Sequence, residues 1–405
     1  MSGAQISSAP GTGKPTSLSG RAQWVATMCG CIVAFAYSAN YTNHAPLVPA
    51  LRLQFGFNQA LAGLLTTGIF ATHAATQIPG GHIVDRFGAK RVLLAALVIV
   101  AIGNLGMASA QAYWQLLFFK IFTGLGTGVC FVGGARYIHA AAAGPRLNVS
   151  QGLFGGSIQL GAGFVIFAVP RLSLYAGWRI TFLVSAGMAL LAAGIWMAGA
   201  PDVAFPEAPP GQLHKMLLAP QLWLLGTLQM VTFGFSVVVG AWVVVFLKQI
   251  MKIPATQAGL IGSLVLLLGI VARPLGGYLR QHMGIRPILF ASVLMITIGC
   301  FSFTSSSLSL GVAWTAVILL GMGTSLPYAA MFSRAGALFP GRAGAAMGLV
   351  NMLGIIMILA GAPLVGHLAD ITGNFRTSFE FLGGCALLAC LVIPLIERDE
   401  PVAHP

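Results

Sequence analysis

The chain has 405 residues, of which 57% are hydrophobic and only 7% are charged. A soluble domain carries about 25% charged residues, so this composition excludes an ordinary soluble protein and indicates an integral membrane protein. The formal net charge of +13 does not indicate a nucleic-acid partner. The basic residues stand singly or in threes between apolar runs, which is typical of the cytoplasmic ends of membrane helices.

Apolar runs divided at prolines, glycines and charge clusters predict twelve membrane helices. We expect two six-helix halves over residues 21–199 and 218–398, joined by a proline-rich cytoplasmic linker over 200–217. Residues 1–20 and 399–405 are expected to form cytoplasmic tails, the first of them disordered. The predicted spans are 24–44, 60–82, 92–110, 114–135, 151–171, 178–199, 219–247, 258–280, 288–306, 311–333, 345–367 and 378–396.

The basic residues predict the orientation of these spans. With the N-terminus inside, thirteen of them lie on the cytoplasmic side and seven on the outer side, while Arg273 falls within a span. This excess follows the positive-inside rule. Both termini are therefore predicted to be cytoplasmic, and a bacterial inner membrane is the expected location.

The two halves repeat in sequence. Gln77–Gly81 aligns with Arg273–Gly277 at an offset of 196 residues. The same offset relates further glycines of the two halves, namely Gly88 and Gly284, Gly152 and Gly348, and Gly177 and Gly373. Several separate segments that agree in offset predict two homologous halves with a site between them near the middle of the membrane.

A glycine-rich charged segment, Gly80–Arg91, follows the second predicted span and is expected to be a short loop before the third. Its glycines permit a tight reversal and a close approach of backbones, and Asp85 can accept hydrogen bonds from free amides at the start of a helix. The alternative is a basic turn that only fixes topology.

This segment, with its pattern Gly-x-x-x-Asp-Arg-x-Gly-x-Lys/Arg, closely resembles the loop between helices 2 and 3 of major facilitator superfamily transporters. The resemblance extends over residues 21–398. It implies an all-α membrane protein of twelve transmembrane helices in two pseudo-symmetric six-helix halves. It also implies an inner gate, for which the candidates in this segment are Gly81, Asp85, Arg86, Gly88 and Arg91. Arg136 and Arg334, at corresponding cytoplasmic ends of the fourth and tenth predicted spans, are further gate candidates, and the equal alternative is that they only fix topology. Lys120 stands where the superfamily usually has an arginine used in proton coupling.

Arg273 is the most informative side chain, because it lies well inside the eighth predicted span. A guanidinium at membrane depth costs at least about 2.5–3.5 kcal/mol on insertion scales, so it should face a wet cavity or a partner. All eight acidic residues fall in predicted loops, helix ends, the linker or the tail. The charge is therefore predicted to bind an anionic ligand, since the guanidinium fork suits planar anions. The alternative is an arginine satisfied by backbone carbonyls.

Further polar side chains within the spans are candidates to line a substrate path. On the first span they fall at i, i+3 and i+4, which is one face of a helix. Hydrogen bonds that only hold helices together are the alternative. The predicted substrate-binding residues besides Arg273 are Tyr37, Asn40, Tyr41, His73, Gln77, Gln159, Gln229, Tyr328 and Asn351.

Within the superfamily, Ala272–Gly277 looks like the eighth helix of nitrate/nitrite porters, where the arginine holds the anion; a cyanate permease-like branch is also similar. Those porters have a second arginine on helix 2, where this chain has Gln77. One cationic group in place of two predicts a different or larger anion, such as a cyanate-like anion or a monocarboxylate.

We therefore expect a secondary active transporter for a small organic or inorganic anion, working by alternating access as a monomer in the lipid bilayer. The alternatives are a transporter-derived sensor or scaffold without flux, and a carrier for a neutral solute. No enzyme activity, cofactor or metal site is expected, and no nucleotide-binding loop is present. Because no acid lies within a span, exchange of anions or proton movement with the substrate is favoured.

Overall fold

A computed structural model describes residues 18–305 and 309–398, and every regular element in them is helical. The predicted tails lie outside the described residues except for 18–20. The helices of the first half of the chain are α1 Gly20–Thr42, α2 Val48–Phe55, α3 Gln59–Ala75, α4 Gln77–Phe87, α5 Ala89–Ser109, α6 Tyr113–Ala141 and α7 Pro145–Gly199. A 3₁₀ turn, η1 (Ala45–Leu47), joins α1 to α2.

The rest of the chain forms ten more helices within the described residues. They are α8 Gln212–Leu217, α9 Pro220–Gln229, α10 Phe235–Gln249, α11 Ala255–Leu267, α12 Gly269–His282, α13 Ile285–Ser302, α14 Leu310–Ser325, α15 Tyr328–Leu338, α16 Ala343–Thr372 and α17 Phe375–Ala389. A π-helical turn, η2 (Met230–Gly234), joins α9 to α10. Two 3₁₀ turns complete the fold, η3 (Pro340–Arg342) before α16 and η4 (Cys390–Leu395) after α17.

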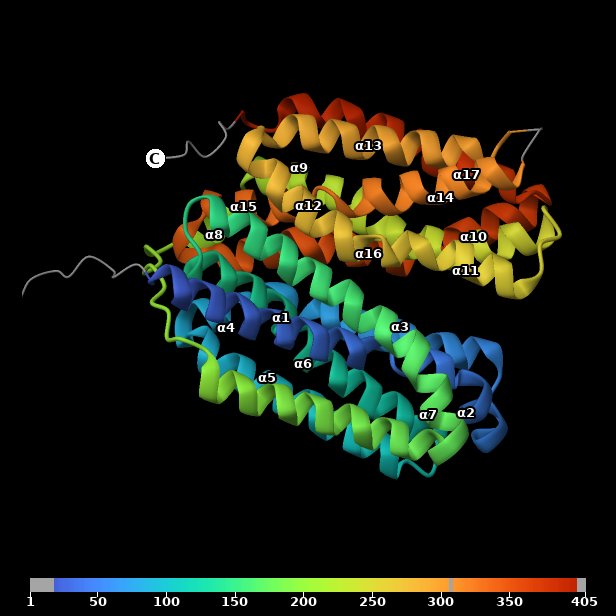
Figure 1. Ribbon diagram of the computed structural model, residues 1–405, viewed down its shortest axis with the longest axis horizontal. Coiled ribbons are helices and arrows are strands. Elements are labelled where there is room, and N and C mark those ends of the chain that lie inside the picture. The colour runs from blue at the N-terminus through green and yellow to red at the C-terminus, as the bar shows by residue number, and fades with distance from the viewer. Residues whose placement is uncertain (1–17, 306–308, 399–405) are drawn as a thin grey trace, which may run out of the picture.

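Ten helical segments of the described chain are long and apolar enough to cross a membrane. One of them, α7, contains Gly177 at φ 81°, where the chain reverses direction (Figure 1). The apolar helix α3, continued by α4, supplies another crossing. These two features bring the number of crossings to the predicted twelve. The surface fits lipid, since large apolar side chains such as Phe118 (61% exposed) and Leu191 (65% exposed) face outward.

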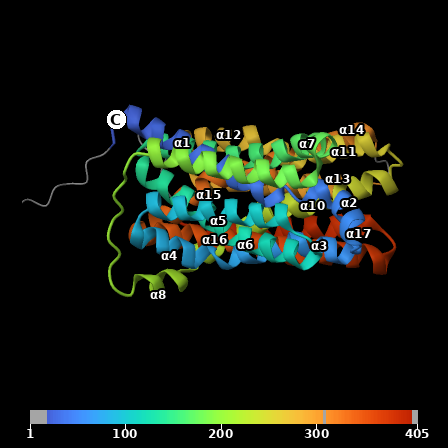
Figure 2. The same cartoon turned by 90° about the horizontal axis from the view of Figure 1, so that it is seen from below.

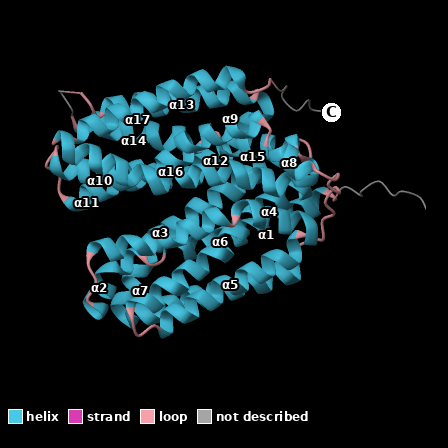
Figure 3. Ribbon diagram, turned by 180° about the vertical axis from the view of Figure 1, so that it is seen from behind, coloured by secondary structure: helices cyan, strands magenta, loops and turns pink. Residues whose placement is uncertain are grey.

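The helices form two groups that lie side by side along the long axis of the molecule. Helices α1–α7 make one group and α9–α17 the other, in both face views (Figures 1 and 3). The chain between them passes around one end of the molecule to α8 (Figure 2). We call this the linker end; both ends of the described chain lie there, and the two groups diverge toward the opposite end (Figure 1).

Several crossings are interrupted near their middle, at a proline, at a π turn or at a single residue between two helices. Thr76 separates α3 from α4, because Pro79 has no N–H to donate to the carbonyl of Ala75. Leu268 separates α11 from α12, and Leu326–Pro327 separates α14 from α15. Such broken helices in a membrane are tolerated where they are buried in protein or line a cavity.

Residues 80–91 do not form the predicted loop. Helix α4 continues to Phe87 and α5 begins at Ala89, so that Gly88 alone makes the turn, at φ 81°. The polar sequence suggested a loop, but His82 and Asp85 of this segment have partners in the other half of the molecule, described below. The predicted linker also differs in part, because its last six residues form helix α8.

Glycines bring the two halves into backbone contact at two related places. A Cβ on Gly81 of α4 would overlap the backbone of Gly344 and Ala345 in α16, and one on Gly348 would overlap Gln77. The second place joins α7 to α12. There, Gly152 faces the backbone of Arg273 and Pro274, and Gly277 faces that of Asn148. Gly81 and Gly277, like Gly152 and Gly348, are 196 residues apart, so the sequence repeat appears in space as two equivalent seams.

Gly81→Ala tests the seam between α4 and α16. The added methyl group has to displace the α16 backbone, and overpacking of this kind costs about 1–3 kcal/mol. Hydrogen–deuterium exchange of the α16 amides over 344–348 should become faster. The matched control is Gly63→Ala, also within a helix, where a Cβ meets nothing within 4 Å. Equal protection of these amides from exchange in both variants would contradict the close backbone contact between α4 and α16.

Candidate functional site

A small cavity lies between the two halves, at the level of the interrupted helices. It holds a space of about 20 Å³, enough for roughly one water molecule. Both halves line it, with helices α1, α3, α6 and α7 on one side and α9, η2, α12, α15 and α16 on the other. The lining residues are Tyr37, Tyr41, Phe70, His73, Phe131, Ile158, Gln229, Phe233, Arg273, Tyr328 and Asn351.

Arg273 supplies the one permanently charged side chain among these lining residues. Its residue is only 3% exposed, and its guanidinium lies 4.5 Å from the centre of the Tyr328 ring. Nη1 donates to the carbonyl of Gly155 in the other half at 3.0 Å, while Nε is buried without a partner. No described carboxylate pairs with it. The guanidinium is therefore only partly satisfied and keeps donor capacity for an anion.

Local chain geometry places this arginine against the opposite half. Helix α12 starts at Gly269, directly after the break at Leu268, and Arg273 follows one turn later. Gly155 lets α7 approach closely, because a Cβ there would meet the Tyr328 ring at 2.5 Å and the Arg273 side chain at 2.9 Å. The alternative predicted from the sequence, an arginine satisfied by backbone carbonyls, is realised for one of its nitrogen atoms only.

Aromatic rings dominate the side of the cavity that the first half provides. We call Tyr37, Tyr41, Phe70, His73 and Phe131 the aromatic wall. The His73 ring lies 6.0 Å from Tyr41, 6.2 Å from Phe131, 6.4 Å from Tyr37 and 6.5 Å from Phe70, measured between centroids. Its Nδ1 forms a hydrogen bond of 3.1 Å with Thr127 Oγ1, which fixes the orientation of the ring.

The side provided by the second half is more polar. Gln229 Nε2 donates to Asn351 Oδ1 at 3.4 Å, and Asn351 Nδ2 donates to Gln77 Oε1 at 3.3 Å. These contacts run from α9 through α16 to α4, so a polar chain crosses from one half to the other. The hydroxyls of Tyr37 and Tyr328 are buried without a partner and remain available to a ligand.

Seven of the ten residues predicted to bind substrate line this cavity: Tyr37, Tyr41, His73, Gln229, Arg273, Tyr328 and Asn351. The other three have different surroundings. Gln77 bonds the carbonyl of His73 and the side chain of Asn351, Asn40 bonds the carbonyl of Ala36, and Gln159 bonds the carbonyl of Leu266. These three residues serve contacts between or within helices, the role weighed as the alternative.

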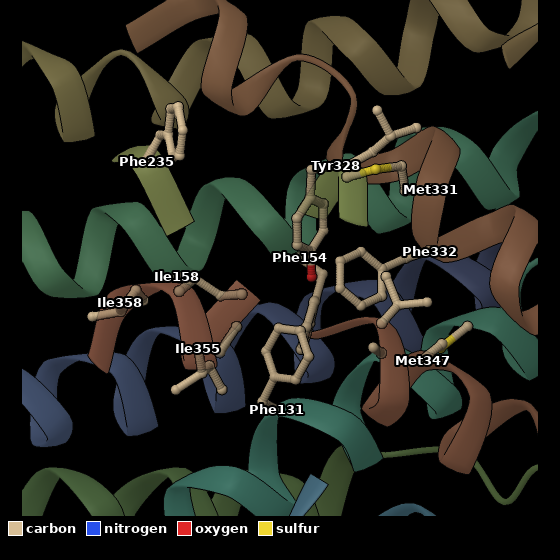
Figure 4. Packing of buried hydrophobic residues seen from close by; sticks show 14 of the residues in the cluster. Phe131, Phe154, Ile158, Phe235, Tyr328, Met331, Phe332, Met347, Ile355 and Ile358 are labelled. Atoms are coloured by element: carbon tan, nitrogen blue, oxygen red, sulfur yellow. The ribbon is translucent and has the colours of Figure 1, made fainter. Parts of the chain in front are cut away.

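The sequence reasoning missed the apolar lining residues Phe70, Phe131, Ile158 and Phe233. A signal was present for one of them, since Phe70 stands three residues before His73 on the same helical face. Figure 4 shows Phe131 and Phe332 facing each other across the contact between the halves, and their ring centres are 5.4 Å apart. Apolar packing thus continues from the cavity toward the linker end.

Asp85 and Arg136 form a buried ion pair at the linker end. Arg136 Nε donates to Asp85 Oδ1 at 2.7 Å, and both side chains are at most 2% exposed. Asp85 also accepts from the amides of Gly344 and Ala345, at 3.2 and 3.3 Å. These amides begin helix α16, whose N-terminus favours an anion. Hydrogen bonding to a helix start was expected from the sequence, but the partner helix could not be named.

A second contact of Arg136 also joins the halves, since its Nη2 donates to the carbonyl of Pro340 at 3.0 Å. His82 of α4 and Arg342 of η3 form another hydrogen bond across the same end, and no sequence pattern indicated it. Asp85 and Arg136 are therefore the centre of a polar contact that closes the linker end.

The remaining gate candidates Arg86, Gly88, Arg91 and Arg334 take no part in this polar contact between the halves. Gly88 makes the turn between α4 and α5. Arg86 and Arg91 are exposed, and neither pairs with a described carboxylate. Arg334 pairs with Glu397 at 2.6 Å within the second half, so it does not bridge the halves.

Lys120 of α6 is fully buried away from the cavity. Its Nζ donates to the carbonyl of Asn40 at 3.1 Å and to Asn43 Oδ1 at 2.8 Å. Asn43 in turn donates to Asn104 of α5 at 2.8 Å. This polar network ties α1, α5 and α6 together within the first half.

The fold and the central cavity define the class as a multi-pass membrane transporter. The chain belongs to the Major Facilitator Superfamily, whose family model matches residues 30–362 and 224–405. Among solved structures, the chain is similar to the transporter FucP in the outward conformation, with a TM-score of 0.78 and 15% identity over 94% of this chain and all of that one. The human organic anion transporter MFSD10 gives a TM-score of 0.75 at 15% identity, covering 92% of this chain and 99% of that one.

Curated relatives match nearly end to end and are transporters rather than enzymes. A probable nitrate/nitrite antiporter of Thermus thermophilus is 24% identical over 94% of this chain and 93% of its own length. A probable sulfoacetate transporter of Cupriavidus necator is 25% identical over 92% of this chain and 94% of its own length. The relatives thus carry the names of anion transporters, including the nitrate/nitrite porters that the eighth span resembles.

Asp85→Asn tests the buried ion pair. Removal of one partner leaves the buried charge of Arg136 uncompensated, which costs about 3–5 kcal/mol, so thermal unfolding in detergent should occur at a clearly lower temperature. Asp202→Asn is the control, because Asp202 is 86% exposed and lies 3.6 Å from Lys90; such surface pairs contribute about 0–1 kcal/mol. Equal unfolding temperatures for the two variants would exclude a stabilising role for Asp85.

Proposed function

We propose that this protein is a secondary transporter that carries a small anion across the membrane by alternating access, with Arg273 as the anion-binding group. The names of the relatives from Thermus thermophilus and Cupriavidus necator support an anionic cargo. The proposed location is the inner membrane of a bacterium, with the linker end and both termini in the cytoplasm, because the basic residues favour that side. The proposed functional unit is a monomer.

One observation carries this proposal: the Arg273 guanidinium is buried between the halves with no described carboxylate beside it. An unpaired charge in a low-dielectric site is costly, and the cost is recovered when a ligand of opposite charge arrives. The free Nε and the unpartnered hydroxyls of Tyr37 and Tyr328 are donors suited to the oxygen atoms of an anion.

Closure at the linker end gives the proposal its mechanism. The glycine seams join the halves on this side of the cavity, as do the hydrogen bonds of Asp85 and Arg136 to the backbone around the start of α16. The halves diverge toward the opposite end (Figure 1). This arrangement corresponds to a carrier closed to the cytoplasm. To release cargo inward, the halves must rock, and Asp85 must then leave the amides of Gly344 and Ala345.

Arg273 can also link binding to this motion. Its Nη1 donates to the Gly155 carbonyl of the opposite half, so a bound anion competes with a contact between the halves. Differential contacts of this kind let a ligand shift a conformational equilibrium. Since no carboxylate lines the described cavity, we propose coupling by exchange of anions or by a proton that travels with the substrate.

Arg273→Ala should abolish anion uptake into proteoliposomes, and Arg273→Lys should retain only a small part of it, because an ammonium lacks the planar fork. Both proteins should still insert and run as folded monomers on size exclusion. Arg171→Ala is the control, since Arg171 is exposed and donates to the carbonyl of Phe167 in its own helix. Undiminished anion uptake by Arg273→Ala would remove Arg273 from the mechanism, and uptake of neutral solutes alone would contradict an anion carrier.

A further inference from the structure

We infer that the cargo is an organic monoanion, a carboxylate on a compact apolar body. In a state whose cavity is wider than the space for one water described above, its charge lies on the second half of the molecule and its body lies against the aromatic wall of the first. This inference rests on the proposed function and adds the chemical class and the orientation of the cargo.

The charge of the cavity limits the substrate to one negative charge. Arg273 is the single permanently charged group among the described lining residues. Gln229 and Asn351, its polar neighbours from the same half, are neutral and bonded to each other. One guanidinium compensates one carboxylate, and it leaves a second carboxylate of the same solute without a cation.

The opposite side of the cavity suits an apolar group. Tyr41 and Phe70 lie ring to ring at 5.5 Å, and Ile158 adds an aliphatic surface. His73 is the titratable side chain of this side besides the two tyrosines, and its Nδ1 is already bonded to Thr127. A second anionic group placed here would lose its water for apolar contacts, which is unfavourable. A methylene chain or a small ring would instead gain from its burial.

Nitrate fits poorly into a cavity that has its charge on one side and apolar rings on the other. It presents oxygen atoms in every in-plane direction, so a nitrate held by Arg273 and Tyr37 still directs oxygen toward the part of the aromatic wall formed by Phe70 and Phe131, which offers no donor. A carboxylate with a hydrocarbon body directs oxygen toward Arg273 and the hydroxyls of Tyr37 and Tyr328, and carbon toward the rings of Phe70 and Phe131. The second arrangement uses the donors present and covers the apolar surface.

The test measures dissociation constants of the purified full-length protein in detergent for acetate, propionate and butyrate, with nitrate and the dianion sulfoacetate as competitors. Each buried methylene should tighten binding roughly fourfold, so butyrate should bind about fifteenfold tighter than acetate. Nitrate and sulfoacetate should bind no better than acetate. Tighter binding of nitrate or sulfoacetate than of butyrate would overturn the inference.

Phe70→Ala adds a second measurement, because it removes part of the wall without touching Arg273. The fourfold gain in affinity per methylene should shrink below twofold. Phe118→Ala is the matched control, since Phe118 is 61% exposed on the outer surface, and it should keep the full gain. An unchanged gain in Phe70→Ala would contradict the proposed orientation.

These outcomes separate the inference from the proposed function. If all anions bind with equal strength and this binding is lost in Arg273→Ala, the inference of an organic monoanion is overturned, while the proposal of an anion carrier remains supported. Anion binding of wild-type strength in Arg273→Ala would overturn the carrier mechanism itself.

Discussion

A buried positive charge without a negative partner is the constraint on which the structure of this site depends. Arg273 is held between the halves by one backbone carbonyl and one aromatic ring, and its Nε has no partner. Helix α12 begins just before it, and Gly155 allows the facing helix to approach. A membrane protein retains such a group where a ligand compensates its charge.

The same region is where the two halves meet, so the proposed binding site and the proposed motion share residues. Gly152 of one half lies on the backbone of Arg273, and its repeat-mate Gly348 lies on the backbone of Gln77. The pseudo-symmetry therefore places an arginine in one seam and a glutamine in the other. This difference between equivalent positions leaves the charge on one side of the cavity only, since Arg273 lines it and Gln77 does not.

Most of the fold could be predicted from the sequence, because apolar runs, prolines and the repeat offset are local or periodic signals. Arg273 stood out because a charge within a span is costly. The loop predicted over 80–91 was wrong, since the partners of Asp85 and His82 lie about 260 residues away. The contacts of Gln77 and Gln159 could not be predicted either, because a polar residue within a span gives the same sequence pattern whether it faces a cavity or a neighbouring helix. From the sequence, Phe131 and Phe233 could not be distinguished from residues of the ordinary apolar core, although they line the cavity.

The central claim is that an organic anion binds to Arg273 with its body against the aromatic wall. Crystals soaked with 3-bromopropionate would test it most directly, because bromine is located by its anomalous scattering. The account predicts a bromine position beside Phe70 and Tyr41, with the carboxylate within hydrogen-bonding distance of Arg273. Bromine found only elsewhere, such as beside Lys120 or on the basic surface at the linker end, would contradict it.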